Sequence, residues 1–216
     1  MGGGSLVSQN WVLTAAHNVL ETHGLVKASS ITVFLGSVNR RSRSGVRVSE
    51  VHAHPQFNIS HAEETGDYAY DIALLRLTEP ITFTNTIRPV CLPCTSEVSD
   101  FLSAPTASWE SQCLYQDRIL TGSGGADWRE ITGYVTGWGK TKRGGRANLL
   151  QYGQISIKQR DKCQRDHLDQ TVFCAKGDGV DSCQGDSGGP FTIKVRQRWI
   201  QIGIVKFWFR HQLPWG

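Results

Sequence analysis

A serine in a glycine-rich segment is the residue of this sequence best suited to chemistry. Residues 183–190 are Cys-Gln-Gly-Asp-Ser-Gly-Gly-Pro, so Ser187 has glycines on both sides. A serine hydroxyl is a weak nucleophile, and it must be held on a sharp turn and paired with a base. Glycines allow that turn, and they can aim the N–H groups of Gly185 and Ser187 at one developing oxyanion. The segment therefore predicts a nucleophilic serine with an oxyanion site.

Two upstream residues supply a base and a carboxylate. His17 ends the apolar run Trp11–His17, where small alanines leave room for an imidazole, and Asp71 stands directly before Ile72–Leu75. Each residue alone is more commonly structural, as a histidine packed after a strand or an aspartate at a turn. Together with Ser187 they occur in the order His, Asp, Ser, and this combination favours nucleophilic catalysis.

A second motif overlaps the serine. Residues 185–189 also fit the G-x-S-x-G turn of α/β-hydrolases, in which the acid and the histidine follow the serine. The only histidine after Ser187 is His211, and no strand–helix frame surrounds it. The order of residues therefore argues against that arrangement.

Short β-favouring runs must position these three residues. They alternate with clusters of Gly, Pro, Asn and Ser, and this spacing predicts an all-β barrel or sandwich. Helix is expected only in short turns, such as Ala15–Leu20 and Lys158–His167. The polar stretch Ser103–Glu130 is predicted to be a long surface loop. The expected strands are Trp11–Leu13, Ile31–Leu35, Ile72–Leu77, Tyr134–Thr136, Gln154–Ile157, Phe191–Val195 and Trp199–Val205.

Composition indicates a globular protein with one sizeable core or two small ones. The chain has 216 residues, of which 39% are hydrophobic and 19% charged, and its net charge is +4. That charge is too small to require a nucleic-acid partner. The arginines within residues 40–47 fit a solvated loop, or else a site for an acidic partner or glycan. No apolar run reaches the about 20 residues of a membrane helix, so no membrane association is expected.

Taken together, the motifs resemble those of the chymotrypsin/trypsin family of serine proteases. The resemblance implies an all-β fold of two antiparallel six-stranded β-barrels. It also implies a single peptidase domain over residues 1–216, with the barrels dividing near residues 90–103. The segments that carry it are Ala15–His17, Asp71–Leu75, Val135–Gly139 and Gly185–Pro190.

The resemblance implies an activity and a specificity. The activity is peptide-bond hydrolysis through an acyl-enzyme without a cofactor, with His17 as base, Asp71 as its orienting carboxylate and Ser187 as nucleophile. Asp181 takes the position at the floor of the primary pocket, with Ser182 beside it, so protein or peptide substrates cleaved after Arg or Lys are expected. The alternative for Asp181 is a surface turn next to Gly179.

Six cysteines suggest an oxidising compartment, and the resemblance implies how they pair. Cys163 and Cys174 match a family disulfide, and Cys94 and Cys113 are expected to close the unusual loop. Cys91 matches the cysteine that tethers the protease domain to a regulatory chain. A zinc site at Cys91 and Cys94 would need a second close ligand pair, and none follows, so no metal is expected.

Other family cysteines are absent in pairs. Asn18 follows the histidine where the family has a cysteine, and Gly3 is expected at its partner position. Gly133 and Ile193 stand where a second bridge is lost. These losses, with the cysteine-closed insertion, resemble complement-type proteases. Arginines replace the clustered acids of the family's calcium loop between residues 35 and 52, so no calcium site is expected.

Two departures from the family bear on activity. Asp186 matches the aspartate that pairs with a new N-terminus on zymogen activation, but the segment Met1–Ser5 has neither that terminus nor a signal peptide. After Val205 the family continues Ser-Trp-Gly, whereas this chain has Lys206-Phe-Trp208, and Trp208 is expected to obstruct the pocket. The sequence thus predicts a partial or aberrant chain of a secreted zymogen. A non-catalytic homologue acting as a binding or regulatory module is the alternative.

Overall fold

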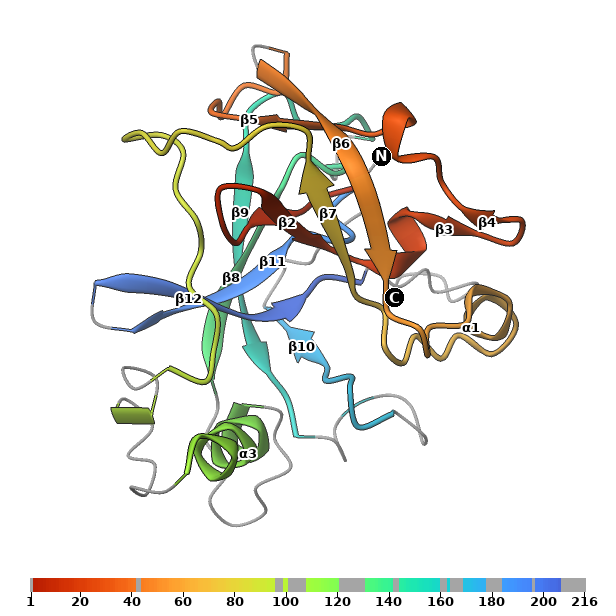
Figure 1. Cartoon of the computed structure of the whole chain (residues 1–216). Helices are drawn as coiled ribbons and strands as arrows, with labels where there is room; N and C mark the ends of the chain where they lie inside the picture. The colour runs from red at the N-terminus through yellow and green to blue at the C-terminus, as the bar shows by residue number, and fades with distance from the viewer. Residues whose placement is uncertain are drawn as a thin grey trace.

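A computed structural model describes residues 2–41, 44–95, 99–100, 108–120, 131–141, 144–159, 163, 169–177, 184–195 and 197–206 (Figure 1). The first half of the chain forms an antiparallel sheet with the strand order β1-β2-β7-β6-β5. Its inward side chains include Val12, Leu75 and Leu77, which are buried in one hydrophobic cluster. The strands are β1 (Ser5–Leu6), β2 (Trp11–Thr14), β5 (Thr32–Leu35), β6 (Ser44–Ala53) and β7 (Ala73–Leu77).

The second half forms another antiparallel sheet, with the order β10-β9-β8-β11-β12. Its core is a separate cluster that includes Ile157, Ile193 and Ile200. Alternate residues of each strand point inward, as expected for a sheet with one buried face. The strands are β8 (Thr132–Gly137), β9 (Gln151–Ile157), β10 (Ala175–Lys176), β11 (Pro190–Val195) and β12 (Arg198–Ile204).

These two curled sheets and two cores confirm the predicted all-β fold of the trypsin type. Each sheet has five strands among the described residues. All seven predicted runs overlap strands, with Ile31, Ile72 and Val205 one residue outside, but the longest strand, β6, was not predicted. Its register shifts between Val48 and Glu50, so its apolar positions 46, 48, 51 and 53 do not keep a strict two-residue period.

Short elements connect the strands. The expected turn at Ala15–Leu20 is present as η1 (Ala16–Asn18), and a second such turn is η2 (Ala28–Ser30). A small hairpin joins β3 (Leu20–Glu21) to β4 (Gly24–Leu25), and α1 spans Ile59–Thr65. Residues 160–162 and 164–167 of the other expected turn lie outside the described residues.

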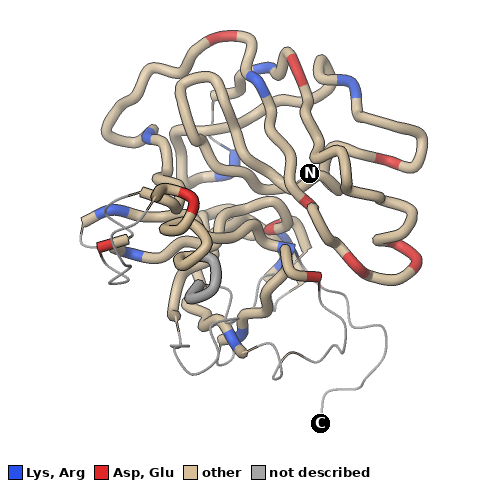
Figure 2. Tube along the Cα trace, turned by 60° about the horizontal axis from the view of Figure 1, so that its bottom comes forward, with Lys and Arg blue, Asp and Glu red and all other residues tan. Residues whose placement is uncertain are grey.

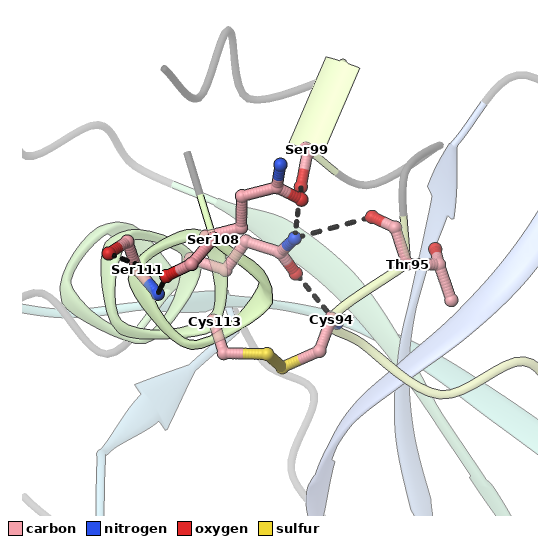
Figure 3. The surroundings of a disulfide bond; sticks show 8 residues. Cys94, Thr95, Ser99, Ser108, Ser111 and Cys113 are labelled. Atoms are coloured by element: carbon pink, nitrogen blue, oxygen red, sulfur yellow. Dashed lines mark hydrogen bonds between the residues drawn. A yellow bond between two sulfur atoms is a disulfide. The ribbon is translucent and has the colours of Figure 1, made fainter. Parts of the chain in front are cut away.

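The prediction of a loop over Ser103–Glu130 is wrong in its centre, where helix α3 runs from Trp109 to Leu120. Cys113 of this helix is joined to Cys94 (Figure 3). The side chain of Gln116 is 1% exposed and accepts a hydrogen bond from the Cys94 N–H at 2.8 Å. Within residues 109–116, the part of the helix whose side chains the structure describes, the buried residue is polar, so this part lacks the apolar stripe that would have predicted a helix.

Charges of both signs are distributed over the fold. Figure 2 shows Lys and Arg in short segments interspersed with Asp and Glu along the described trace. None of the helices in the described part of the chain is long and apolar enough to cross a membrane.

Candidate active site

The histidine lies on the turn that follows β2. Ala15 and Ala16 are 1% and 0% exposed, so the chain packs closely before η1 and brings His17 to the edge of the sheet. The His17 side chain keeps 14% of its surface exposed. It is therefore held firmly at its base while its outer edge can still be reached.

Asp71 holds His17 at two points. Its Oδ1 accepts the His17 backbone N–H at 2.8 Å, and its Oδ2 lies 2.6 Å from His17 Nδ1. The pairing of Thr14 with Ala73 explains this approach, because it sets the segment before β7, which contains Asp71, beside the turn after β2. The Asp71 side chain is 8% exposed. With Nδ1 engaged by the carboxylate, Nε2 is the nitrogen left to take up a proton.

A tight turn presents Asp71. The Ile72 N–H donates to the Tyr70 carbonyl oxygen at 2.7 Å, which closes a three-residue turn centred on Asp71. Tyr70 has a φ of 60°, in the left-handed region that non-glycine residues seldom occupy. Its ring stacks on His54 at 5.0 Å, and its N–H donates to Thr171 Oγ1 at 3.1 Å. These contacts stabilise the unusual backbone where the carboxylate is needed.

The Ser187 turn depends on its glycines. Gly185 has a φ of 104° and Gly188 a φ of 86°, conformations that side chains disfavour. The Gly188 N–H donates to the Val205 carbonyl at 2.7 Å, and the Gly189 N–H to the Asp186 carbonyl at 2.9 Å. The Ser187 carbonyl oxygen accepts Asn18 Nδ2 at 2.9 Å. The structure thus brings the serine turn against the turn that carries His17.

The Asp186 side chain lies against the backbone where strand β8 ends. Its Oδ1 accepts the Gly139 N–H at 2.7 Å. A Cβ at Gly137 or Gly139 would collide with this carboxylate. The two glycines therefore make the space in which Asp186 sits.

Sequence reasoning missed two residues beside His17. The Tyr68 ring meets the imidazole edge-on, with ring centroids 5.9 Å apart, and Lys206 Nζ lies 3.7 Å from the Tyr68 ring centroid. Burial lowers the pKa of Lys206, and the negative charge of Asp71 partly offsets this. Lys206 was noted only as a departure from the family, because its neighbours come from the other end of the chain.

The remaining predicted site residues are the two pocket residues and the cysteines. Asp181 and Ser182 lie outside the described residues. Cys163 is joined to Cys174. Cys91, a free cysteine in the part of the chain that the structure describes, donates its N–H to the Trp199 carbonyl at 3.1 Å and so lies beside β12. Within the described ranges, no group of three or more His, Cys, Asp or Glu residues could hold a metal ion.

One expectation is wrong by a single residue. The glycine opposite Asn18 is Gly2, because a Cβ there would lie 2.5 Å from Asn18 Cγ. A Cβ at Gly3 would instead meet the Gly189 backbone at 2.8 Å. Position 2, rather than 3, is therefore where a cysteine would face position 18.

Comparison with known proteins agrees with this fold and shows the family. The family model described as Trypsin matches residues 1–123 and 121–214, and the chain therefore belongs to the trypsin family of serine proteases. Vitamin K-dependent protein C of Rattus norvegicus is 31% identical over 214 residues, covering 95% of this chain and 40% of its own. The Suppressor of tumorigenicity 14 protein homolog of Bos taurus is 33% identical over 219 residues, covering 95% of this chain and 22% of its own. The chain thus spans less than half the length of these relatives.

Proposed function

We propose that this chain is a serine endopeptidase that hydrolyses peptide bonds after Arg or Lys. The observation that carries the proposal is the double contact of Asp71 with His17, at 2.8 and 2.6 Å, beside the turn of Ser187. The carboxylate fixes the ring and its tautomer and stabilises the imidazolium that forms during the reaction. This is what a weak serine nucleophile needs from its base.

The reaction follows from these roles. Ser187 Oγ attacks the scissile carbonyl carbon while its proton passes to His17 Nε2, and the N–H groups of Gly185 and Ser187 stabilise the oxyanion. The imidazolium then gives the proton to the leaving amine as the C–N bond breaks, and an acyl-enzyme ester remains. Water attacks this ester, again with His17 as base, and the proton returns to Ser187 Oγ. Asp71 stays ionised throughout.

We also propose roles for three residues that precede Ser187 in the sequence. The carboxylate of Asp181, with Ser182 beside it, would bind the Arg or Lys side chain of the substrate. Asp186 would accept the new N-terminal ammonium of an activated zymogen. Its carboxylate already lies against the Gly137 and Gly139 backbone, where strand β8 ends.

The setting of the enzyme is also a proposal. We place the chain outside the cell, because the two disulfides among its described residues need an oxidising compartment. Cys91 would tether a regulatory chain. The chain would form one peptidase domain with two subdomains dividing near residues 90–103.

The test uses the full-length protein that contains this chain, in its activated form. A fluorophosphonate probe should label Ser187, and the Ser187→Ala variant should not be labelled. Peptide amides with Arg or Lys before the scissile bond should be cleaved in preference to those with Phe, and Asp181→Ser should abolish the preference. Absence of labelling in a folded, activated protein would instead support a non-catalytic binding module.

A further inference from the structure

The backbone carbonyl of Ser187 is held from the other sheet. Its oxygen accepts the Gly3 N–H at 2.8 Å and the Asn18 side-chain amide at 2.9 Å. A carbonyl oxygen has two lone pairs, so both donors can be satisfied at once. Asn18 precedes Ser187 by 169 residues. The nucleophile turn is therefore fastened to the first half of the chain by both donors.

The Asn18 amide is itself fixed by a closed ring of hydrogen bonds. Its Nδ2 also donates to Thr14 Oγ1 at 3.2 Å, and the Thr14 hydroxyl donates to the Gly3 carbonyl at 2.8 Å. The Gly3 N–H in turn donates to the Ser187 carbonyl oxygen, which closes the ring. Because Thr14 gives its only hydroxyl hydrogen to Gly3, its oxygen is an acceptor for Asn18, and the orientation of the carboxamide is determined.

The carboxamide fills a slot between two glycines. A Cβ on Gly188 would lie 2.5 Å from both the Gly3 carbonyl oxygen and Thr14 Oγ1, and it would collide with Asn18. A Cβ on Gly2 would collide with Asn18 from another side. With Asn18 between the two turns, neither glycine position therefore has room for a side chain.

We propose that Asn18 is a positioning residue, whose carboxamide locks the Ser187 carbonyl to the turn that carries His17. Asn18 follows His17 directly in η1, so one rigid turn holds the base and clamps the nucleophile. The inference rests on the proposed peptidase function and extends it to a residue that does not touch the substrate. A displacement of about 1 Å between reacting groups can slow a reaction by about a hundredfold, so such a clamp affects the rate.

Asn18→Asp tests the clamp with almost no change in size. The carboxylate loses both donated hydrogen bonds and faces two oxygen atoms. We expect labelling of Ser187 by a fluorophosphonate probe to slow about tenfold, and hydrogen exchange of the Gly3 N–H to accelerate. Asn85→Asp makes the same charge change at an exposed loop position and should leave both rates unaltered.

A disulfide provides the rescue. A Cβ at Gly2 lies 2.5 Å from Asn18 Cγ, which limits the separation of the two Cβ atoms to about 4 Å, within the range of a disulfide. In the oxidised Gly2→Cys/Asn18→Cys variant, the crosslink holds the His17 turn to the segment whose Gly3 N–H still binds Ser187. Labelling should return to within about twofold of the original chain. Reductant should slow this variant more than the original chain treated in the same way.

The outcomes separate the inference from the proposed function. If Asn18→Asp is labelled as fast as the original chain with unchanged Gly3 exchange, or if the oxidised variant folds but is not rescued, the clamp is rejected. If the original chain is not labelled at all, the peptidase proposal fails, and Gly3 exchange alone decides on the clamp. If Asn18→Asp does not fold, the oxidised and reduced cysteine variant supplies the same comparison.

Discussion

Lys206 places a positive charge beside the paired His17 and Asp71. Its Nζ lies 3.7 Å from the centroid of the Tyr68 ring, which in turn meets His17 edge-on. Burial lowers the pKa of Lys206 below its ordinary value of 10.5, while the charges of Asp71 and Glu63 raise it in part. The folded protein therefore binds a proton on Lys206 less readily than the unfolded chain does.

This difference predicts how stability depends on pH. Between the lowered pKa and 10.5 the unfolded state binds more protons, so the contribution of Lys206 to stability improves as pH rises through that window. The stability of the original chain relative to Lys206→Met should therefore increase from neutral pH towards 10.5, by less than about 1 kcal/mol because solvent still screens the ammonium.

Urea denaturation at several pH values measures this change. Lys27→Met is the control, because it removes one positive charge at an exposed position and so shows how the loss of a charge alone changes the stability. The prediction would be contradicted if the free energy of unfolding of the original chain, relative to that of Lys206→Met, fell as pH rises towards 10.5.

At the level of the elements, strand β8 depends on a glycine for its packing. A Cβ at Gly133 would lie 2.6 Å from Phe191 Cζ and 2.6 Å from the Thr192 carbonyl oxygen. The carbonyl belongs to the paired strand β11 and cannot move independently. We expect Gly133→Ala to destabilise the protein by about 1–3 kcal/mol, as overpacked cores do. Gly145→Ala, where a Cβ would meet no atom within 4 Å, is the matched control, and equal urea midpoints for the two variants would refute the prediction.

At the level of the whole molecule, polar contacts join the two halves of the chain at several places. Ser5 of β1 donates to Gln201 of β12, and both side chains are buried. The closed ring of hydrogen bonds through Asn18, Thr14, Gly3 and the Ser187 carbonyl makes another connection. Both observed disulfides, Cys94–Cys113 and Cys163–Cys174, lie beyond the last strand of the first sheet, with sequence separations of 19 and 11.

Reduction should therefore affect the halves unequally. Loops of this size contribute about 3 kcal/mol each through the unfolded state. We expect reductant to accelerate amide hydrogen exchange in β9 and β12 before it does so in β2 and β7. Simultaneous acceleration in all four strands would mean that the two cores open as one unit.

Much of the fold could be predicted because its signals are local. The β-favouring runs all overlap strands, since two-residue alternation depends only on neighbours in the chain. Strand β6 was missed because a bulge breaks the alternation, and α3 because the buried residue within its described side chains, 109–116, is Gln116. Both failures arise where a long-range partner overrides a local pattern.

By itself, the sequence determined the family and the likeness of residues 185–190 to a nucleophile turn. Glycines at 185 and 188 encode their left-handed backbone locally, and the apolar runs encode the strands. Only the tertiary structure decided what Asn18, Tyr68 and Lys206 contact. The residues that they contact are distant in the chain, by up to 169 residues for Asn18 and Ser187. The strength of a hydrogen bond and the free energy of burying a charge depend on which atoms are close in space, and not on separation along the chain. Such contacts leave no period or spacing in the sequence from which they could be predicted.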